Sequence, residues 1–277
     1  MIEKFAVIIG AMKSGTTSLF RYLEQHPAIA PCSQKEPHFF GKDENWERGL
    51  GWYEDLWDWE PQRHEYALEA STSCTKRPLF PDAAARMAET GREFKLIYCL
   101  RDPLDRIESH LAHAMLNGWV DERTHIRRIP AIIETTRYAA QLRTYRRHFS
   151  DDEILLVNFA DLVSEPDRVV ERICEFLEVD TDVELAGLGE AHNRTKSDFR
   201  DSTPSSLLKK AGLLDESTIA NLPGPLREGY RAVLQEEIPS PELSEAEREW
   251  VRFTLAGDTQ LLEEEYGFDT GDWLDGP

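Results

Sequence analysis

A glycine-bounded turn near the beginning of the chain limits the folds that this sequence can adopt. Residues 6–9 form a short apolar run, typical of a parallel strand covered on both faces. Gly10 and Gly15 follow it and let the backbone turn sharply and approach a ligand closely. Three hydroxyl residues come next and begin a helix: Thr16, Thr17 and Ser18. The N-terminus of a helix favours phosphate-like groups. The pattern predicts a strand, a turn and a helix in an α/β fold that holds an anionic nucleotide.

The lysine of this turn differs in position from the lysine of triphosphate-binding loops. The Walker pattern is G-x-x-x-x-G-K-[ST], with lysine directly after the second glycine. Here Thr16 occupies that position, and Lys13 lies inside the turn. Because ATP with Mg²⁺ needs the Walker lysine at its β- and γ-phosphates, the change favours a less charged group beyond the first phosphate. A glycine turn that binds no ligand is the alternative.

A second apolar run, residues 94–100, ends at an arginine. Asp102 suits the N-cap of a helix and Pro103 its first position, so the helix begins directly after Arg101. Arg101 therefore lies at the carboxyl end of a strand, where open α/β sheets bind ligands, and its planar guanidinium suits a phosphate monoester. Ser109 lies about two turns into the helix and can face the same ligand. The alternatives are a salt bridge to a nearby aspartate and an ordinary helical serine.

Together these segments resemble sulfotransferases that use 3′-phosphoadenosine 5′-phosphosulfate (PAPS). The turn at residues 10–19 resembles their 5′-phosphosulfate-binding loop, and LEQHP at 23–27 and KEPHFF at 35–40 are similar to the heparan-type and bacterial branch. The resemblance runs from Phe5 to roughly Arg200. It implies PAPS as co-substrate, no metal, and a three-layer α/β fold with a mainly parallel central sheet, a P-loop-like turn and helices on both faces.

The resemblance also implies roles for individual residues. Arg101 and Ser109 hold the 3′-phosphate, which distinguishes PAPS from ATP. Tyr138, which can instead be a core or surface aromatic, approaches the nucleotide, and Lys196 lies in a basic loop that closes over it. Lys13 stabilises the charge that develops on the leaving 5′-phosphate. The 5′-phosphosulfate itself is held by Lys13, Ser14, Gly15, Thr16, Thr17 and Ser18.

An acceptor hydroxyl or amine needs a base to take its proton. The resemblance makes Glu36 the first candidate, and His38 the second, as a base or as a residue that orients the acceptor. Pro37 is expected to hold Glu36 in an extended conformation, which favours a loop over a helix interior. In the alternative interpretation, Glu36 pairs with Lys35 or an arginine, and His38 is a partly buried histidine beside two phenylalanines. Lys35 itself is expected to be solvated.

The chain departs from the heparan-type pattern after the third predicted strand. Those enzymes carry a lysine after the glutamate that ends this strand, whereas Ala70 follows Glu69 here. The expected fold and co-substrate are unaffected, but the heparan substrate does not carry over directly. A second catalytic cation is either missing or supplied by Lys35 or Lys76.

The net charge of the chain indicates which class of acceptor it can attract. The formal net charge of −20 and the pI of about 4.8 give no general attraction for a polyanionic glycosaminoglycan or nucleic acid. We therefore expect a small or neutral acceptor, such as a sugar, a lipid head group or another metabolite. Two alternatives are an ATP-dependent small-molecule kinase and a non-catalytic nucleotide-binding protein on the same fold.

Other features point to a cytoplasmic protein without a metal. The first strand begins within a few residues of Met1, and no apolar run approaches about 18 residues, so neither a signal peptide nor stable membrane insertion is expected. His110 and His113 lie three residues apart without a zinc signature around them. Four scattered cysteines, without a C-x-x-C pair, indicate a reducing compartment: Cys32, Cys74, Cys99 and Cys174.

Alternating strand and helix patterns predict one α/β core over residues 1–200. Residues 201–277 are expected to form an acidic helical extension packed on the same domain, in a monomer or homodimer. The tryptophan-rich segment 46–59 either lines an acceptor pocket or packs inside. Strands are expected at residues 5–9, 28–32, 66–69, 95–100 and 154–158. Helices are expected at residues 16–25, from 103 onward, and at 137–149, 167–177 and 243–265, the last with a capping pattern at 244–247.

Overall fold

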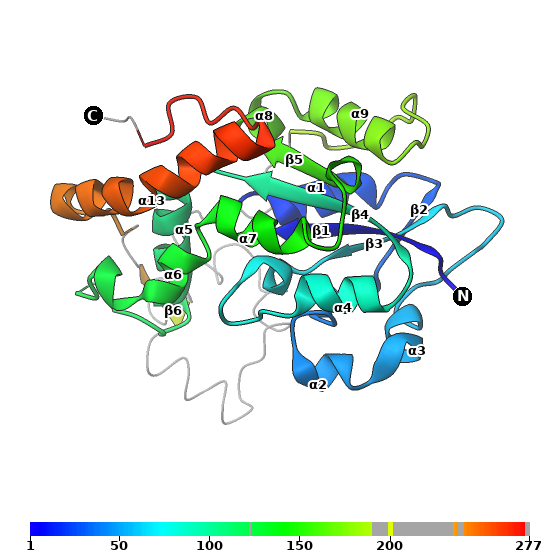
Figure 1. The fold of residues 1–277 in the computed structure, drawn as a ribbon, viewed down its shortest axis with the longest axis horizontal. Helices are drawn as coiled ribbons and strands as arrows, with labels where there is room; N and C mark the ends of the chain where they lie inside the picture. The colour runs from blue at the N-terminus through cyan, green and yellow to red at the C-terminus, as the bar shows by residue number, and fades with distance from the viewer. Residues whose placement is uncertain (122, 190–198, 202–234, 238–240, 275–277) are drawn as a thin grey trace.

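The centre of the protein is a five-stranded parallel sheet with the order β2-β3-β1-β4-β5 (Figure 1). The computed structural model describes residues 1–121, 123–189, 199–201, 235–237 and 241–274. The strands are β1 (Lys4–Gly10), β2 (Ile29–Pro31), β3 (Tyr66–Ala70), β4 (Glu93–Leu100) and β5 (Ile154–Asn158). All five predicted strands are confirmed, with ends that differ by a residue or two. The predicted three-layer α/β fold is confirmed.

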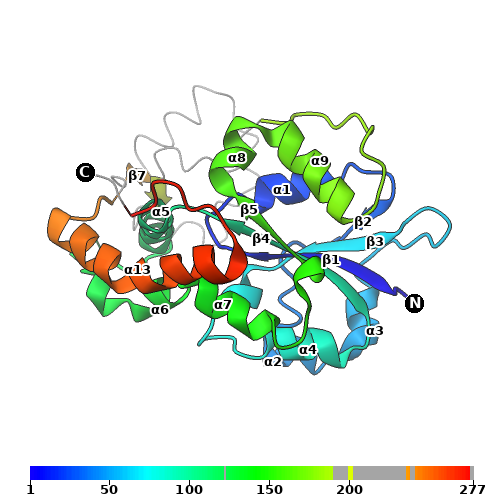
Figure 2. The ribbon, with the colours of Figure 1, turned by 45° about the horizontal axis from the view of Figure 1, so that its top comes forward.

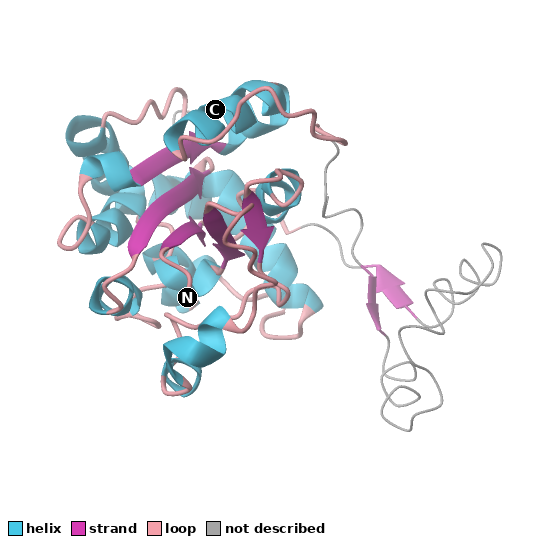
Figure 3. Ribbon diagram, turned by 90° about the vertical axis from the view of Figure 1, so that its right-hand side faces the viewer, coloured by secondary structure: helices cyan, strands magenta, loops and turns pink. Residues whose placement is uncertain are grey.

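Helices cover both faces of the sheet, as Figure 2 shows. On one face lie α1 (Thr16–Leu23), α8 (Phe159–Ser164) and α9 (Pro166–Phe176). The other face carries α2 (Asp43–Trp46), α3 (Gly49–Glu54), α4 (Ala83–Glu89), α7 (Tyr138–Tyr145) and α13 (Glu245–Tyr266). The remaining described helices are α5 (Pro103–Leu116), α6 (Pro130–Glu134) and the short 3₁₀ turns η1 (Thr72–Thr75), η2 (Ile126–Arg128) and η3 (Asp151–Glu153). Two short strands, β6 (Phe199–Asp201) and β7 (Gln235–Glu237), pair antiparallel beside this body (Figure 3).

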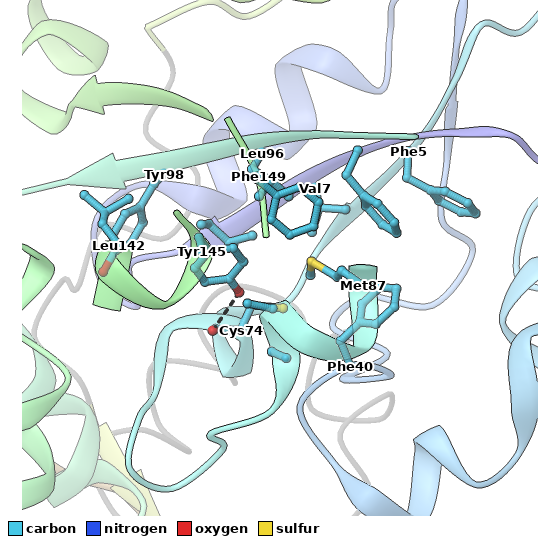
Figure 4. Packing of buried hydrophobic residues seen from close by; sticks show 14 of the residues in the cluster. Phe5, Val7, Phe40, Cys74, Met87, Leu96, Tyr98, Leu142, Tyr145 and Phe149 are labelled. Atoms are coloured by element: carbon cyan, nitrogen blue, oxygen red, sulfur yellow. Dashed lines mark hydrogen bonds between the residues drawn. The ribbon is translucent and has the colours of Figure 1, made fainter. Parts of the chain in front are cut away.

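The apolar run in β1 is buried on both sides because successive side chains of a strand point to opposite faces. Phe5 and Val7 join a cluster of aromatic and aliphatic side chains with helices α4 and α7, whereas Ala6 and Ile8 pack on the side of α1 and α9. Figure 4 shows the first cluster, in which the Tyr145 hydroxyl donates to the Cys74 carbonyl at 2.8 Å. This double burial fixes the end of β1, where the glycine turn begins.

The tryptophan-rich segment packs inside. Trp57 is buried against Phe5 and Tyr53, with ring centroids 5.6 Å and 4.8 Å apart. Trp46 and Trp52 lie within 6 Å of the Phe39 ring, and Trp59 packs on the same cluster. Of the two uses predicted for this segment, the structure shows packing.

Helix α13 joins the C-terminal region to the core. Its capping box at Ser244 and Glu247 is present as predicted. The carboxylate of Asp258 is buried on its inner face and accepts hydrogen bonds from the N–H groups of Ala139 and Ala140, both at 3.0 Å. These N–H groups lie in the first turn of α7 and have no partner within that helix. Asp258 therefore caps α7 from another element.

We expect Asp258→Asn to lower the free energy of unfolding by about 1–3 kcal/mol, because the carboxylate then no longer satisfies both N–H groups. Urea denaturation measures the change. Glu249→Gln removes the same charge from an exposed position on the same helix and is the matched control. Equal stability of the two variants would contradict the capping role.

Candidate functional site

A cavity of about 1150 Å³ opens at the carboxyl ends of β1, β3 and β4. It is lined by the turn after β1, the loop after β2, the segment after β3 and one face of α5. Most of the predicted site residues line it together: Lys13, Gly15, Thr16, Thr17, Ser18, Glu36, His38, Arg101 and Ser109. Of the remaining predictions, Lys196 lies outside the described residues.

The turn after β1 has the geometry of an anion-binding loop. Gly15 (φ 80°) is the N-cap of α1, and a Cβ there would lie 2.9 Å from the side chains of Phe159 and Leu162, so the site requires glycine. Among the described residues no side chain caps this helix, and its first turn holds no acidic residue. The N–H groups of Thr16 and Thr17, at the start of the helix, therefore suit an anion in the cavity.

Ser14 does not lie with the other residues of the turn. It is fully buried and does not line the cavity, and its N–H donates to the Ala11 carbonyl at 3.1 Å. Its hydroxyl is buried without a hydrogen-bond partner among the described residues, and a contact of Ser14 with the nucleotide stays a prediction. Ser14 shapes the turn from behind.

Arg101 closes the other side of the turn. Its Nη1 donates to the Lys13 carbonyl at 3.4 Å, and its guanidinium lies 4.9 Å from the centre of the Phe159 ring. Nη2 makes the alternative salt bridge, to Asp105 at 3.2 Å. Nε is buried without a hydrogen-bond partner among the described residues. Arg101 therefore retains one N–H donor for an anion. Ser109 lines the same cavity.

Tyr138 lies behind the site. The side chain is buried, does not line the cavity, and donates from its hydroxyl to the Arg101 carbonyl at 2.8 Å. The structure thus gives it the core position that was the alternative to nucleotide contact. It holds the backbone from which Arg101 projects.

Arg106 is a residue of the site region that the sequence analysis missed. It is 1% exposed, and its Nε donates to the Met12 carbonyl at 3.0 Å. Its Nη atoms donate to the hydroxyls of Thr136 and Thr135, at 2.5 Å and 3.4 Å. The guanidinium therefore ties the turn to α5 and to the end of α6. No sequence signal indicated this role, because an arginine on an amphipathic helix ordinarily reaches solvent.

Glu36 and His38 face each other across the cavity wall. His38 Nε2 lies 3.4 Å from Glu36 Oε2, and the Thr72 hydroxyl donates to the same oxygen at 3.5 Å. The hydroxyls that follow β3 orient the histidine: Ser71 accepts from its N–H, and Ser73 contacts its Nδ1, both at 3.0 Å. Burial lowers the pKa of His38, although the Glu36 carboxylate acts in the opposite direction. This direction favours the neutral form of the imidazole.

The predicted extended conformation of Glu36 is wrong. Its φ is +50°, and His38 (φ +53°) and Lys13 (φ +71°) also lie in the left-handed region. The contacts of Glu36 and His38 with the segment after β3 outweigh the preference of a residue before proline. Three non-glycine residues in this uncommon conformation line one cavity, a concentration typical of functional sites.

Two further lysines line the cavity. Lys35 is exposed, as predicted, and it also donates from Nζ to the Thr17 hydroxyl at 3.1 Å. Lys76 enters from the segment after η1. Burial, and then the positive charges of Arg106, Lys76, His113 and Lys13, lower the pKa of His110 to about 3. Lys13, Lys35, Lys76 and Arg101 line the same cavity as one face of α5.

The described part of the chain lacks two features, a metal-binding cluster and a membrane-spanning helix. It holds no group of three or more His, Cys, Asp or Glu side chains placed to bind a metal ion. Over the same residues, no helix combines the length and the apolar character that a membrane span requires. All four cysteines are buried and unpaired.

Comparison with known sequences adds a family. Residues 4–199 match the family described as Sulfotransferase domain. Over 186 residues the chain is 31% identical to heparan sulfate glucosamine 3-O-sulfotransferase 3A1 of Mus musculus, and the match covers 62% of this chain and 45% of the relative. The chain therefore spans less than half the length of that curated relative.

Solved structures show a similar fold. The sulfotransferase from Alicyclobacillus acidocaldarius superposes with a TM-score of 0.68 and 22% identity, covering 99% of each chain. The sulfotransferase domain from the curacin biosynthetic pathway gives a TM-score of 0.51 and 16% identity, over 98% of this chain and 99% of that one. At these identities the likeness concerns the fold alone.

Proposed function

Because this chain belongs to the sulfotransferase domain family, we propose that it transfers a sulfuryl group from PAPS to a hydroxyl or amine of an acceptor. The observation that carries the proposal is that one cavity unites the glycine turn with Arg101 and Ser109. These two regions suit the two anionic ends of the same nucleotide. A triphosphate site would need a lysine at the position that Thr16 occupies.

The residues present fit this donor. The first turn of α1 and the side chains of Lys13, Thr16 and Thr17 would hold the 5′-phosphosulfate, since they line the cavity beside the close-packed glycine. At the other end, the 3′-phosphate would accept a hydrogen bond from the buried Nε of Arg101. When bound, the donor supplies the activated sulfuryl group, whose bond to the 5′-phosphate oxygen breaks.

Glu36 and His38, which line the cavity, carry out the proton transfer. Glu36 takes the proton of the acceptor as its oxygen or nitrogen bonds to sulfur. His38, held by Ser71 and Ser73, contacts the Glu36 carboxylate and orients it. Lys13 stabilises the negative charge on the departing 5′-phosphate oxygen. Positioning and electrostatics supply the rate, as in phosphoryl transfer.

The acceptor that we propose is a small molecule, a sugar or a lipid head group with little negative charge. The relative from Mus musculus is named for heparan sulfate glucosamine, which makes a sugar hydroxyl a natural first choice. Of the three further carboxylates that line the cavity, Asp105 pairs with Arg101 and Glu108 with Arg248, whereas Glu242 is exposed. What disfavours a polysulfated chain is the net charge of −20 of the whole protein. A cytoplasmic location and a monomeric or homodimeric state stay predictions.

Thermal-shift titration tests the proposal. We expect the donor product 3′-phosphoadenosine 5′-phosphate (PAP) to raise the melting temperature more than ATP or AMP at equal concentration, because only PAP carries the 3′-phosphate. An acceptor screen with labelled PAPS follows. A preference for ATP would favour the kinase alternative. Binding of PAP without transfer to any acceptor would favour the non-catalytic one.

A further inference from the structure

Lys76 is a partly buried cation in the cavity wall. Within the part of the chain that the structure describes, its ammonium group makes no hydrogen bond or ion pair. Removing an ammonium from water without such a partner is costly, and burial accordingly lowers its pKa. A bound anion would remove that cost.

The backbone around Lys76 is fixed on both sides. On one side, the Thr75 hydroxyl donates to the Ile9 carbonyl at 2.9 Å, directly before the glycine turn. On the other, the side chain of Gln141 binds both the N–H and the carbonyl of Arg77, each at 3.1 Å. Lys76 is therefore held beside the start of the turn that carries Lys13.

Its charge acts on both sides of the reacting volume. Glu36 is the foremost group that raises the pKa of Lys76, and Thr72, at the beginning of η1, donates to the Glu36 carboxylate. Lys76 and Lys13 both act on His110. Lys76 also lines the same cavity as Glu36 and Lys13.

We propose that Lys76 contacts the transferring sulfuryl group. The inference rests on the proposed function. As the acceptor atom bonds to sulfur and the bond from sulfur to the 5′-phosphate oxygen breaks, the acceptor proton passes to Glu36. Lys76 keeps its own proton and donates N–H hydrogen bonds to the non-bridging sulfuryl oxygens. Lys76 thus supplies the second catalytic cation, which heparan-type enzymes carry as a lysine at the position of Ala70.

The comparison of PAPS with PAP isolates this contact, since the two nucleotides differ by the sulfuryl group alone. We expect Lys76→Met to reduce the ratio of PAPS affinity to PAP affinity about tenfold or more relative to the wild-type protein. Lys76→Arg should retain most of the ratio. Lys42→Met is the matched control, because its charge acts on both His38 and Lys76 but it does not line the cavity.

Fluorescence or calorimetric titration of both nucleotides gives the ratio, and a thermal melt of each variant checks that it is folded. If Lys76→Met leaves the ratio unchanged, or if Lys42→Met lowers it equally, the role of Lys76 is overturned while the proposed function stands. If the wild-type protein binds neither PAPS nor PAP, both fail.

Discussion

Glu36→Gln is expected to reduce turnover by about 10²- to 10⁴-fold and to leave the affinity for PAP unchanged. Glutamine keeps the size of the side chain and can still contact Thr72 and His38, but it cannot take the proton of the acceptor. The effect is measured as kcat with the acceptor found in the screen, alongside titration of PAP.

Glu89→Gln is the control for this substitution, because Glu89 is an exposed acid that does not line the cavity. Its turnover should stay within a few-fold of the wild-type protein. Undiminished turnover in Glu36→Gln would move the base elsewhere, with His38 the next candidate. A parallel loss of PAP affinity would show instead that Glu36 shapes the nucleotide site.

Arg101→Ala is expected to weaken PAP binding by about 10- to 100-fold, because a charge-assisted contact to the 3′-phosphate contributes about 1.5–3 kcal/mol. AMP lacks that phosphate, so its affinity should change far less. Calorimetric titration of both nucleotides measures the difference. The control Arg137→Ala removes an arginine that pairs with Glu134 at 3.3 Å and does not line the cavity. Equal losses for PAP and AMP would contradict the assigned role.

The parts of the fold that depend on local rules could be predicted from the sequence. The buried run in β1 and the N-cap at Asp102, which accepts from the Asp105 N–H at 2.9 Å, follow from burial and from capping chemistry. So does the capping box at Ser244. That the glycine turn and Arg101 line one cavity was also predictable, since parallel strands bring their carboxyl ends to one edge of a sheet.

Features that depend on contacts distant in sequence could not be predicted. The left-handed conformation of Glu36 depends on hydroxyls more than thirty residues away. The buried position of Arg106 depends on carbonyl and hydroxyl groups of three separate segments. Tyr138 was assigned to the ligand by resemblance, yet its hydroxyl bonds to the backbone of Arg101. In each case the partner is set by the packing of the whole domain.

A crystal structure of the protein with PAP tests the central claim most directly. We predict that the 5′-phosphate lies at the N-terminus of α1 beside Lys13 and that the 3′-phosphate lies against Arg101 and Ser109. A nucleotide that contacts only one of these two regions, or that binds outside this cavity, would contradict the account.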